Sequence, residues 1–275
     1  MLIKKKLSNK ELLPNTFRLF FAKFRYLKEI QELAIPIVLQ KKNAILMSST
    51  SSGKTEAVIA PLTELLLTER WLPLSILWIT PTRALVNDTY NRIEPILKIL
   101  SIKVEKKTGD FPKIKVIEPP DILITTPESL DSMLCRYPII FKNIQAMVID
   151  EIHFIDNNYR GDQLRILIRR LKEINPDFKN YLLSATISEP ERVGIKYIYD
   201  DFEILKSQEK REIIYDLISV ESLQNITEKL YDFIQKEPHN KIIMFSNAKR
   251  IVEEVTYHFK NSPLWKDYTS CFTSW

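Results

Sequence analysis

From Asn43 onward, short apolar runs alternate with segments of helical periodicity, and this alternation limits the possible folds more than any other feature. Such alternation is typical of βαβ units, in which parallel strands are buried between helices. The six predicted strands are Ala44–Ser48, Ser75–Thr80, Ile102–Lys106, Asp121–Thr125, Ala146–Asp150 and Tyr181–Ser184. The predicted helices are Lys54–Glu69, Arg83–Leu100, Pro127–Leu134, Gly161–Glu173 and Pro190–Ile198. The sequence therefore predicts a doubly wound α/β domain with a parallel sheet, and its ligands are expected at the carboxyl ends of the strands.

The pattern divides the chain into unequal parts. We expect an N-terminal arm or helix at 1–28, the α/β domain at 29–206, a connector at 207–222 and a second unit at 223–275. In the second unit the alternation begins again, with a helix from Leu223, a strand at Lys241–Phe245 and a helix at Ala248–Lys260. These last residues have too little surface to bury for an independent domain of this type, so we expect an incomplete second domain.

The N-terminal arm carries eight Lys and Arg residues and one acid in residues 1–28, a net charge of +7, whereas the whole chain has +5. Its aromatic residues are Phe17, Phe20, Phe21, Phe24 and Tyr26. A basic segment with interleaved aromatics could lie on phosphates or on an anionic membrane. The alternative is a solvated amphipathic helix whose aromatic side chains pack on the main domain.

Composition excludes several classes of protein. The 275 residues are 45% hydrophobic and 27% charged, which is enough for a sizeable core. Cys135 and Cys271 form neither a disulfide framework nor a metal-ligand spacing, so we expect a reducing, cytoplasmic location. No stretch approaches the ~20 apolar residues of a membrane helix, and the basic start lacks the apolar region of a signal peptide.

A phosphate-binding loop is predicted after the first strand, where Ser49-Thr50-Ser51-Ser52-Gly53-Lys54-Thr55 precedes an apolar helix. Backbone N–H groups and the helix N-terminus attract phosphates, Lys54 supplies a positive charge, and the Thr55 hydroxyl can ligate Mg²⁺. The strict Walker pattern fails because Ser48 stands at its first glycine. A left-handed backbone at Ser51 would cost roughly 1 kcal/mol.

Two carboxylates, Asp150 and Glu151, follow a later apolar strand. In a parallel sheet they lie at the same edge as the phosphate loop, where Asp150 could hold Mg²⁺ and Glu151 could orient and deprotonate an attacking water. The alternative is a pair of helix N-cap residues. His153 follows directly, and an isolated histidine is more often a hydrogen-bonding residue than a catalyst.

Six segments occur in a familiar order. They are Ser49–Thr55, Pro81–Leu85, Thr108–Asp110, Thr126–Glu128, Asp150–His153 and Ser184–Thr186. Together they resemble motifs I, Ia, Ib, Ic, II and III of superfamily 2 helicases. The Thr-Ser-Ser before Gly53, the Asp-Glu-Ile-His box and the Thr-Pro-Glu segment look most like the Ski-type and Lhr-like branch. Gln31, 23 residues before Lys54, falls where this family places its adenine-reading glutamine; the alternative is a surface helix residue.

The resemblance implies a RecA-like P-loop domain that uses ATP and Mg²⁺. It assigns the nucleotide to Gln31, Thr50, Ser51, Ser52, Gly53, Lys54 and Thr55, the metal to Thr55 and Asp150, and the catalytic water to Glu151. It assigns coupling of the nucleotide state to His153, Ser184, Ala185 and Thr186. It places single-stranded RNA or DNA on Pro81, Thr82, Arg83, Thr108, Gly109, Thr126 and Pro127. Hydroxyls, backbone N–H groups and an arginine suit phosphate contacts that read no sequence. Individually, Pro81 and Pro127 could instead start helices, Thr126 could cap one, and Ser184–Thr186 could be small residues ending a buried strand.

The family also has a second RecA-like domain, and here Lys241–Asn247 resembles motif IV while motifs V and VI have no counterpart. Those motifs carry the arginines that stabilise charge on the transferred phosphoryl group, so the chain alone is expected to hydrolyse ATP poorly. We therefore expect a truncated or split helicase motor. The alternative is a non-catalytic nucleic-acid-binding or regulatory module that works with a second chain supplying the missing domain. A motor subunit of a nuclease shares these motifs, but the sequence contains no nuclease constellation that would favour it.

Overall fold

The computed structural model describes residues 8–22, 25–109, 117–208, 219, 229, 245 and 248–261. The chain divides into two compact units, Met1–Arg211 and Glu212–Trp275. In the second unit the structure describes one helix, α10 (Lys249–Asn261), close to the predicted Ala248–Lys260. The predicted helix from Leu223 lies outside the described residues apart from Lys229, as does the predicted strand at 241–245 apart from Phe245.

The first unit is built on a seven-stranded sheet in which every strand pair is parallel. Its strands are β1 (Asn43–Met47), β2 (Ile76–Ile79), β3 (Val104–Lys107), β4 (Ile122–Thr125), β5 (Ala146–Ile149), β6 (Lys179–Ser184) and β7 (Phe202–Lys206). Their order is β3-β4-β2-β5-β6-β1-β7. The predicted doubly wound parallel sheet is confirmed.

Strand β7 was not among the six predicted strands. It is an edge strand paired only with β1, and two of its five residues, Glu203 and Lys206, are charged and exposed. An edge strand needs no continuous apolar run, so it lacks the signal that revealed the buried strands.

The predicted start of the third strand is wrong by two residues, because β3 begins at Val104 rather than at Ile102. Ser101 has a positive φ of 59°, and the Ile102 N–H donates to the carbonyl of Leu97. Ile102 is therefore part of the turn that ends the preceding helix, although its side chain is buried in the core.

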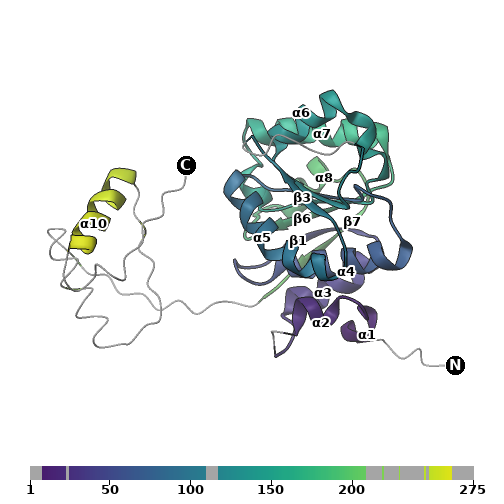
Figure 1. The fold of residues 1–275 in the computed structure, drawn as a ribbon, viewed down its shortest axis with the longest axis horizontal. Coiled ribbons are helices and arrows are strands. Elements are labelled where there is room, and N and C mark those ends of the chain that lie inside the picture. The colour runs from purple at the N-terminus through teal and green to yellow at the C-terminus, as the bar shows by residue number, and fades with distance from the viewer. Residues whose placement is uncertain are drawn as a thin grey trace. The chain divides into compact units, whose positions relative to one another are not determined.

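Helices cover both faces of the sheet, as Figure 1 shows. One apolar cluster contains buried residues of α3 (Glu29–Leu39), α4 (Lys54–Glu69) and α5 (Arg83–Ile99), and the other those of α6 (Pro127–Arg136), α7 (Tyr159–Ile174) and α8 (Pro190–Tyr197). Successive strand residues alternate between the clusters; Trp78 and Val148 belong to the first, Leu77 and Ile149 to the second. Because side chains alternate along a strand, Asp150 continues the face that carries Trp78, Val148 and α4.

The N-terminal arm packs into the first unit. It forms α1 (Asn9–Leu12) and α2 (Phe17–Phe21), and Phe20 and Phe21 are buried in the same cluster as α3 and α4. The alternative in which the arm's aromatic residues pack on the main domain is confirmed for these two. None of the helices in the described part of the chain is both long and apolar enough to cross a membrane.

Candidate nucleotide and strand-binding site

The predicted phosphate loop connects β1 to α4, and the Lys54 side chain lies inside it. The Lys54 ammonium donates to the carbonyls of Ser48 and Ser49 at 2.7 and 3.0 Å. The hydroxyls of Ser48 and Ser52 lie 2.5 Å apart, which closes the loop, while Thr50 and Ser51 are exposed. Burial lowers the pKa of Lys54, and the charges of Glu151 and Asp150 oppose that shift. The ammonium group of Lys54 therefore interacts electrostatically with both carboxylates, Asp150 and Glu151.

The backbone of the loop is left-handed at two positions, with φ of 59° at Ser51 and 81° at Gly53. Ser51 therefore has the left-handed backbone considered from the sequence. That backbone costs about 1 kcal/mol or more for a residue with a Cβ. Gly53 is the N-cap residue of α4. A Cβ there would lie 2.2 Å from the Gln31 amide nitrogen, so both the backbone angle and the neighbouring side chain require glycine.

The start of α3 clamps this loop from the side. Gln31 is fully buried, so the surface-residue alternative is wrong. Its amide nitrogen donates to the Gly53 carbonyl at 3.3 Å and its amide oxygen accepts the Lys28 N–H at 3.1 Å. The Lys28 ammonium donates to the Ser51 carbonyl at 2.5 Å. Gln31 thus lies against the loop that would hold phosphates; its assignment to adenine stays a prediction.

The acidic box follows β5 at the same edge of the sheet. Burial and, after it, the charge of Glu151 raise the pKa of Asp150 to about 6, against the opposing effects of the Trp78 indole, the Glu151 N–H and Lys54. Glu151 has a left-handed φ of 48°. Glu151 occupies the N-cap position of a short 3-10 helix, Ile152–Phe154, but its side chain makes no capping bond, and Asn158 caps α7; the pair therefore caps no helix through Glu151.

The residues of this edge fit a divalent cation. One buried oxygen of Glu151, Oε2, accepts no hydrogen bond from any residue that the structure describes. Burial and the neighbouring charge of Glu151 raise the pKa of Asp150, and a bound divalent cation would offset both effects. Thr55, in the first turn of α4, adds a hydroxyl of the type that Mg²⁺ accepts as a ligand. Hard oxygen donors with surplus negative charge are the ligands that Mg²⁺ prefers.

His153 lies between the acidic box and the end of β6. Its Nδ1 is 3.0 Å from the Ser184 hydroxyl and 3.4 Å from Glu151 Oε2. The Ser184 hydroxyl donates to the carbonyl of Thr186 at 3.1 Å. Ser184 is buried, Ala185 is half-buried and Thr186 is exposed. The structure therefore joins three of the four residues assigned to coupling in one hydrogen-bonded chain.

The residues assigned to the strand lie after β2, β3 and β4, which are neighbours in the sheet. Thr82 and Thr126 are N-caps of α5 and α6 and accept the N–H groups of Leu85 and Ser129. Pro127 is the first residue of α6, whereas Pro81 precedes the cap, so the alternative that Pro81 starts a helix is wrong.

These seven residues differ in exposure. Thr82, Arg83 and Gly109 are exposed, and Pro81, Thr108, Thr126 and Pro127 are buried. A Cβ on Gly109 would lie 2.6 Å from an Arg83 guanidinium nitrogen, so this guanidinium lies directly against the glycine. The exposed subset can contact a strand through side chains, whereas the buried subset shapes the backbone at the edge.

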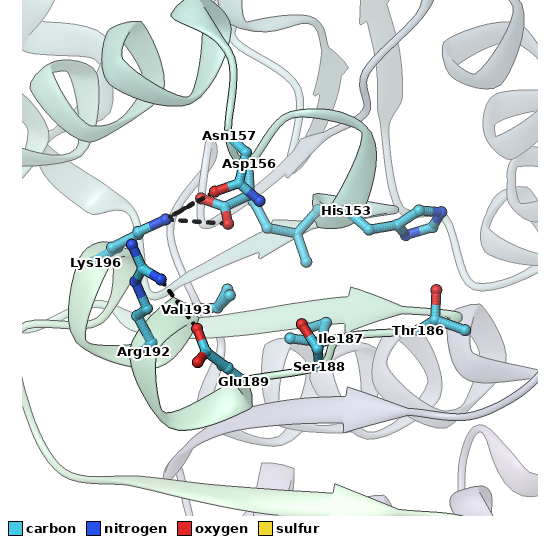
Figure 2. A pocket seen from close by; sticks show the side chains of 11 residues that line it. His153, Asp156, Asn157, Thr186, Ile187, Ser188, Glu189, Arg192, Val193 and Lys196 are labelled. Carbon is cyan, nitrogen blue, oxygen red and sulfur yellow. Dashed lines mark hydrogen bonds and ion pairs between the residues drawn. The ribbon is translucent and has the colours of Figure 1, made fainter.

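The strand order divides the carboxyl edge into two halves. The nucleotide residues follow β1, β5 and β6, and the strand residues follow β2, β3 and β4. Any communication between ATP and a nucleic acid has to cross from one half to the other. A pocket of about 130 Å³ opens beside the first half, lined by His153, Asp156, Thr186, Arg192 and Lys196 among others (Figure 2).

Sequence reasoning missed several residues that hold this edge together. Asp156 is a buried carboxylate that accepts from Lys196 at 2.8 Å and from the Tyr197 hydroxyl at 3.0 Å. Arg160 donates to both carboxylate oxygens of Glu128, at 2.6 and 3.2 Å. An acid or an arginine at a helix start is common on any surface, so neither carried a signal.

Comparisons with known proteins agree with this geometry. The family model for DEAD/DEAH box helicases matches residues 28–193, well over half of the chain. The ATP-dependent helicase Lhr-Core protein 2 of Thermococcus barophilus is 28% identical to this chain, with 91% of this chain and 34% of that protein covered. The chain therefore spans about a third of the length of the curated relatives it matches.

Two solved structures share the fold. Helicase Lhr of Mycobacterium smegmatis, bound to ssDNA and AMP-PNP, has a TM-score of 0.75 and 23% identity, covering 92% of this chain and 36% of that one. The DEAD-box helicase Mss116, bound to ssRNA and UDP-BeF, has a TM-score of 0.76 and 19% identity, covering 94% and 59%. Together with the matched family model, the sheet order and the motif positions, these likenesses lead to one conclusion: the chain belongs to the DEAD/DEAH box helicase family.

Proposed function

We propose that this chain is the ATP-binding half of an ATP-dependent helicase or translocase motor that holds a single strand of RNA or DNA. One observation carries the proposal: Lys54, Asp150 and Glu151 interact electrostatically at the edge of the sheet where the exposed Arg83 and Gly109 also lie. A phosphate-binding lysine and a pair of carboxylates at one edge are among the groups that phosphoryl transfer to water requires.

In this proposal Lys54 and the loop N–H groups hold the β- and γ-phosphates. Gln31, which lies against the loop, contacts the adenine of ATP. Thr55 and Asp150 would hold Mg²⁺, which neutralises charge on the phosphates. Glu151 orients a water and takes its proton, and its orphaned Oε2 is the acceptor available for that step. His153 contacts both Glu151 and Ser184, so a change in the bound nucleotide that moves Glu151 would also move Ser184 and Thr186.

The single strand is supported by the chemistry of the other half of the edge. Thr82, Arg83 and Gly109 offer a hydroxyl, a guanidinium and a close backbone approach, which suit sugar and phosphate rather than base edges. The relatives bound to ssDNA and to ssRNA leave both polymers as candidates. The alternative proposal is a binding module that needs a second chain for turnover.

The test is ATP hydrolysis by the purified chain, with and without single-stranded nucleic acid, beside Glu151→Gln. Because the motif V and VI arginines are missing, we expect slow turnover that is stimulated by the strand and lost in the variant, which keeps the shape of the side chain without its base. Mg²⁺-dependent ATP binding without turnover would favour the binding module. Equal turnover by parent and variant would contradict the role of Glu151, and failure to bind ATP at all would contradict the proposal.

A further inference from the structure

The loop that follows the acidic box connects elements from both halves of the sheet edge. It includes the short helix η2 (Ile152–Phe154) and ends at Arg160 in the first turn of α7. Its first residues contact the nucleotide half, through His153 and Ser184. Its last residue reaches α6, the helix that begins at the strand-binding Thr126 and Pro127. Strand β2 separates β4 from β5, so this loop spans the end of a whole strand.

The Arg160–Glu128 pair has the geometry of a rigid link. Arg160 Nε donates to Glu128 Oε1 and Nη2 donates to Oε2, so the pair is bidentate. Only 19% of the Arg160 side chain is exposed. A bidentate pair sets the relative orientation of its two partners as well as their distance. Glu128 is the second residue of α6, next to Pro127, so a shift of Arg160 moves the start of α6 directly.

The middle of the loop is anchored on the opposite side. Asp156 is held by Lys196 and the Tyr197 hydroxyl from α8, the first helix after Ser184–Thr186, as Figure 2 shows for Lys196. A Cβ on Gly161 would lie 2.8 Å from the Ile155 carbonyl and 2.7 Å from the Tyr197 hydroxyl. Gly161, next to Arg160, therefore packs closely against both the loop and α8, and these contacts are the route by which a displacement at His153 would reach Arg160.

We propose that Arg160 and Glu128 are positioning residues that couple ATP binding at the acidic box to the strand-binding start of α6. This inference rests on the proposed function and goes beyond it, because the proposed function assigns neither residue to the nucleotide or to the strand. The coupling passes through the loop Ile152–Arg160. By thermodynamic reciprocity, ATP changes strand affinity by the same factor as the strand changes ATP affinity.

The test measures the affinity of the full chain for a fluorescently labelled oligo-dT strand, with and without AMP-PNP and Mg²⁺. We expect the parent to show coupling of about 5-fold or more, the lower end of typical allosteric coupling. In Arg160→Met the ratio falls to about 1 while the affinity without nucleotide changes little. Arg160→Lys, which keeps the charge but loses the fork, gives an intermediate ratio.

The matched control is Arg165→Met, which removes an arginine of the same helix whose partner, Asp162, is in that helix too. It should keep the parent's ratio. Restored coupling in the charge-swapped pair Arg160→Glu with Glu128→Arg would support the link directly. Thermal unfolding of each variant checks that it is folded. If Arg160→Met does not fold, the ratio of strand affinities with and without AMP-PNP is taken from Arg160→Lys instead.

Three results would overturn the inference. One is an unchanged coupling ratio in Arg160→Met. Another is an equal loss of strand affinity in both nucleotide states with a shallower salt dependence, which identifies Arg160 as a direct phosphate contact. The third is a parent that binds ATP and strand independently, which leaves the proposed function standing. A parent that binds neither ligand would contradict the proposed function itself.

Discussion

The phosphate loop combines a serine and a glycine that both have left-handed backbone angles. Ser51 tolerates the strain of this backbone. At Gly53 both the backbone angle and the nearby Gln31 side chain exclude a residue with a Cβ. Glu151, the proposed base, has a third left-handed backbone, with one buried oxygen lacking a hydrogen-bond partner among the described residues. Strain and unsatisfied polar atoms concentrate at functional sites, where the surrounding packing maintains them.

Gly53→Ala should lower the free energy of unfolding by at least about 1 kcal/mol, because a Cβ at φ 81° is strained. It should also weaken ATP binding, because the methyl group displaces Gln31 from the loop. Urea denaturation and ATP titration measure the two effects. The control is Ser51→Ala, where a Cβ is already present; we expect its stability to change by less than about 0.5 kcal/mol. A fully stable Gly53→Ala with parental ATP affinity would refute this loop geometry.

Asp150→Asn should make the ligand-free chain more stable at neutral pH. The pKa of Asp150 is raised from 3.8 to about 6 in the folded chain. Below about pH 4 this shift costs no stability; between about pH 4 and pH 6 stability falls as pH rises, because the carboxyl ionises more readily in the unfolded chain. The asparagine does not ionise and avoids that loss, on the order of 3 kcal/mol at full effect. Urea denaturation in EDTA from pH 4 to pH 8 measures it. Parallel pH profiles for the two proteins would contradict the shift.

At the scale of elements, the N-terminal arm is attached by one buried carboxylate. Glu64 of α4 is 3% exposed and accepts from the N–H groups of Asn15 and Thr16, the Asn15 amide and the Thr16 hydroxyl. These donors belong to the segment between α1 and α2. The arm is therefore held by charge-assisted hydrogen bonds as well as by the burial of Phe20 and Phe21.

Glu64→Ala should lower the free energy of unfolding by about 3 kcal/mol, because four donors, two of them the buried donors of Thr16, lose a charged acceptor. Cleavage within the segment between α1 and α2 by a protease should become faster in the variant. Glu69→Ala is the matched control on the same helix, since its bond to Lys41 is at the surface and contributes about 1 kcal/mol at most. Equal losses in the two variants would show that Glu64 does not attach the arm.

For the whole molecule, the arrangement of the sheet edge predicts a salt-dependent, sequence-tolerant grip on a single strand. Arg83→Ala should weaken that binding for every sequence and reduce the salt slope by about 0.7, the value for one lost phosphate contact. Fluorescence anisotropy at several salt concentrations measures the slope. Arg92→Ala, which removes an arginine of the same helix that pairs with Glu56 and Asp88, should leave it unchanged. An unchanged slope in Arg83→Ala would remove Arg83 from the contact.

The sequence alone determined the fold class and the edge at which chemistry is expected. Apolar runs of four to six residues that alternate with helical patterns are typical of buried parallel strands, whose sites lie at the carboxyl ends. The start of α4 at Lys54 and its end at Glu69 follow from the glycine before it and the periodicity within it, and the structure agrees with both. The half-exposed edge strand β7 lacks such a signal and was missed.

Only the tertiary structure decided which residues work together. It buried Gln31 against the phosphate loop, placed Arg83 on Gly109, and joined the loop after the acidic box to α6 and α8 through Arg160 and Asp156. Those contacts link residues about 20 to 40 positions apart, and they arise from the order of strands in the sheet. Local sequence encodes propensity and burial, whereas strand order follows from how all the layers pack at once, so the pairs that cross the edge cannot be read from the sequence alone.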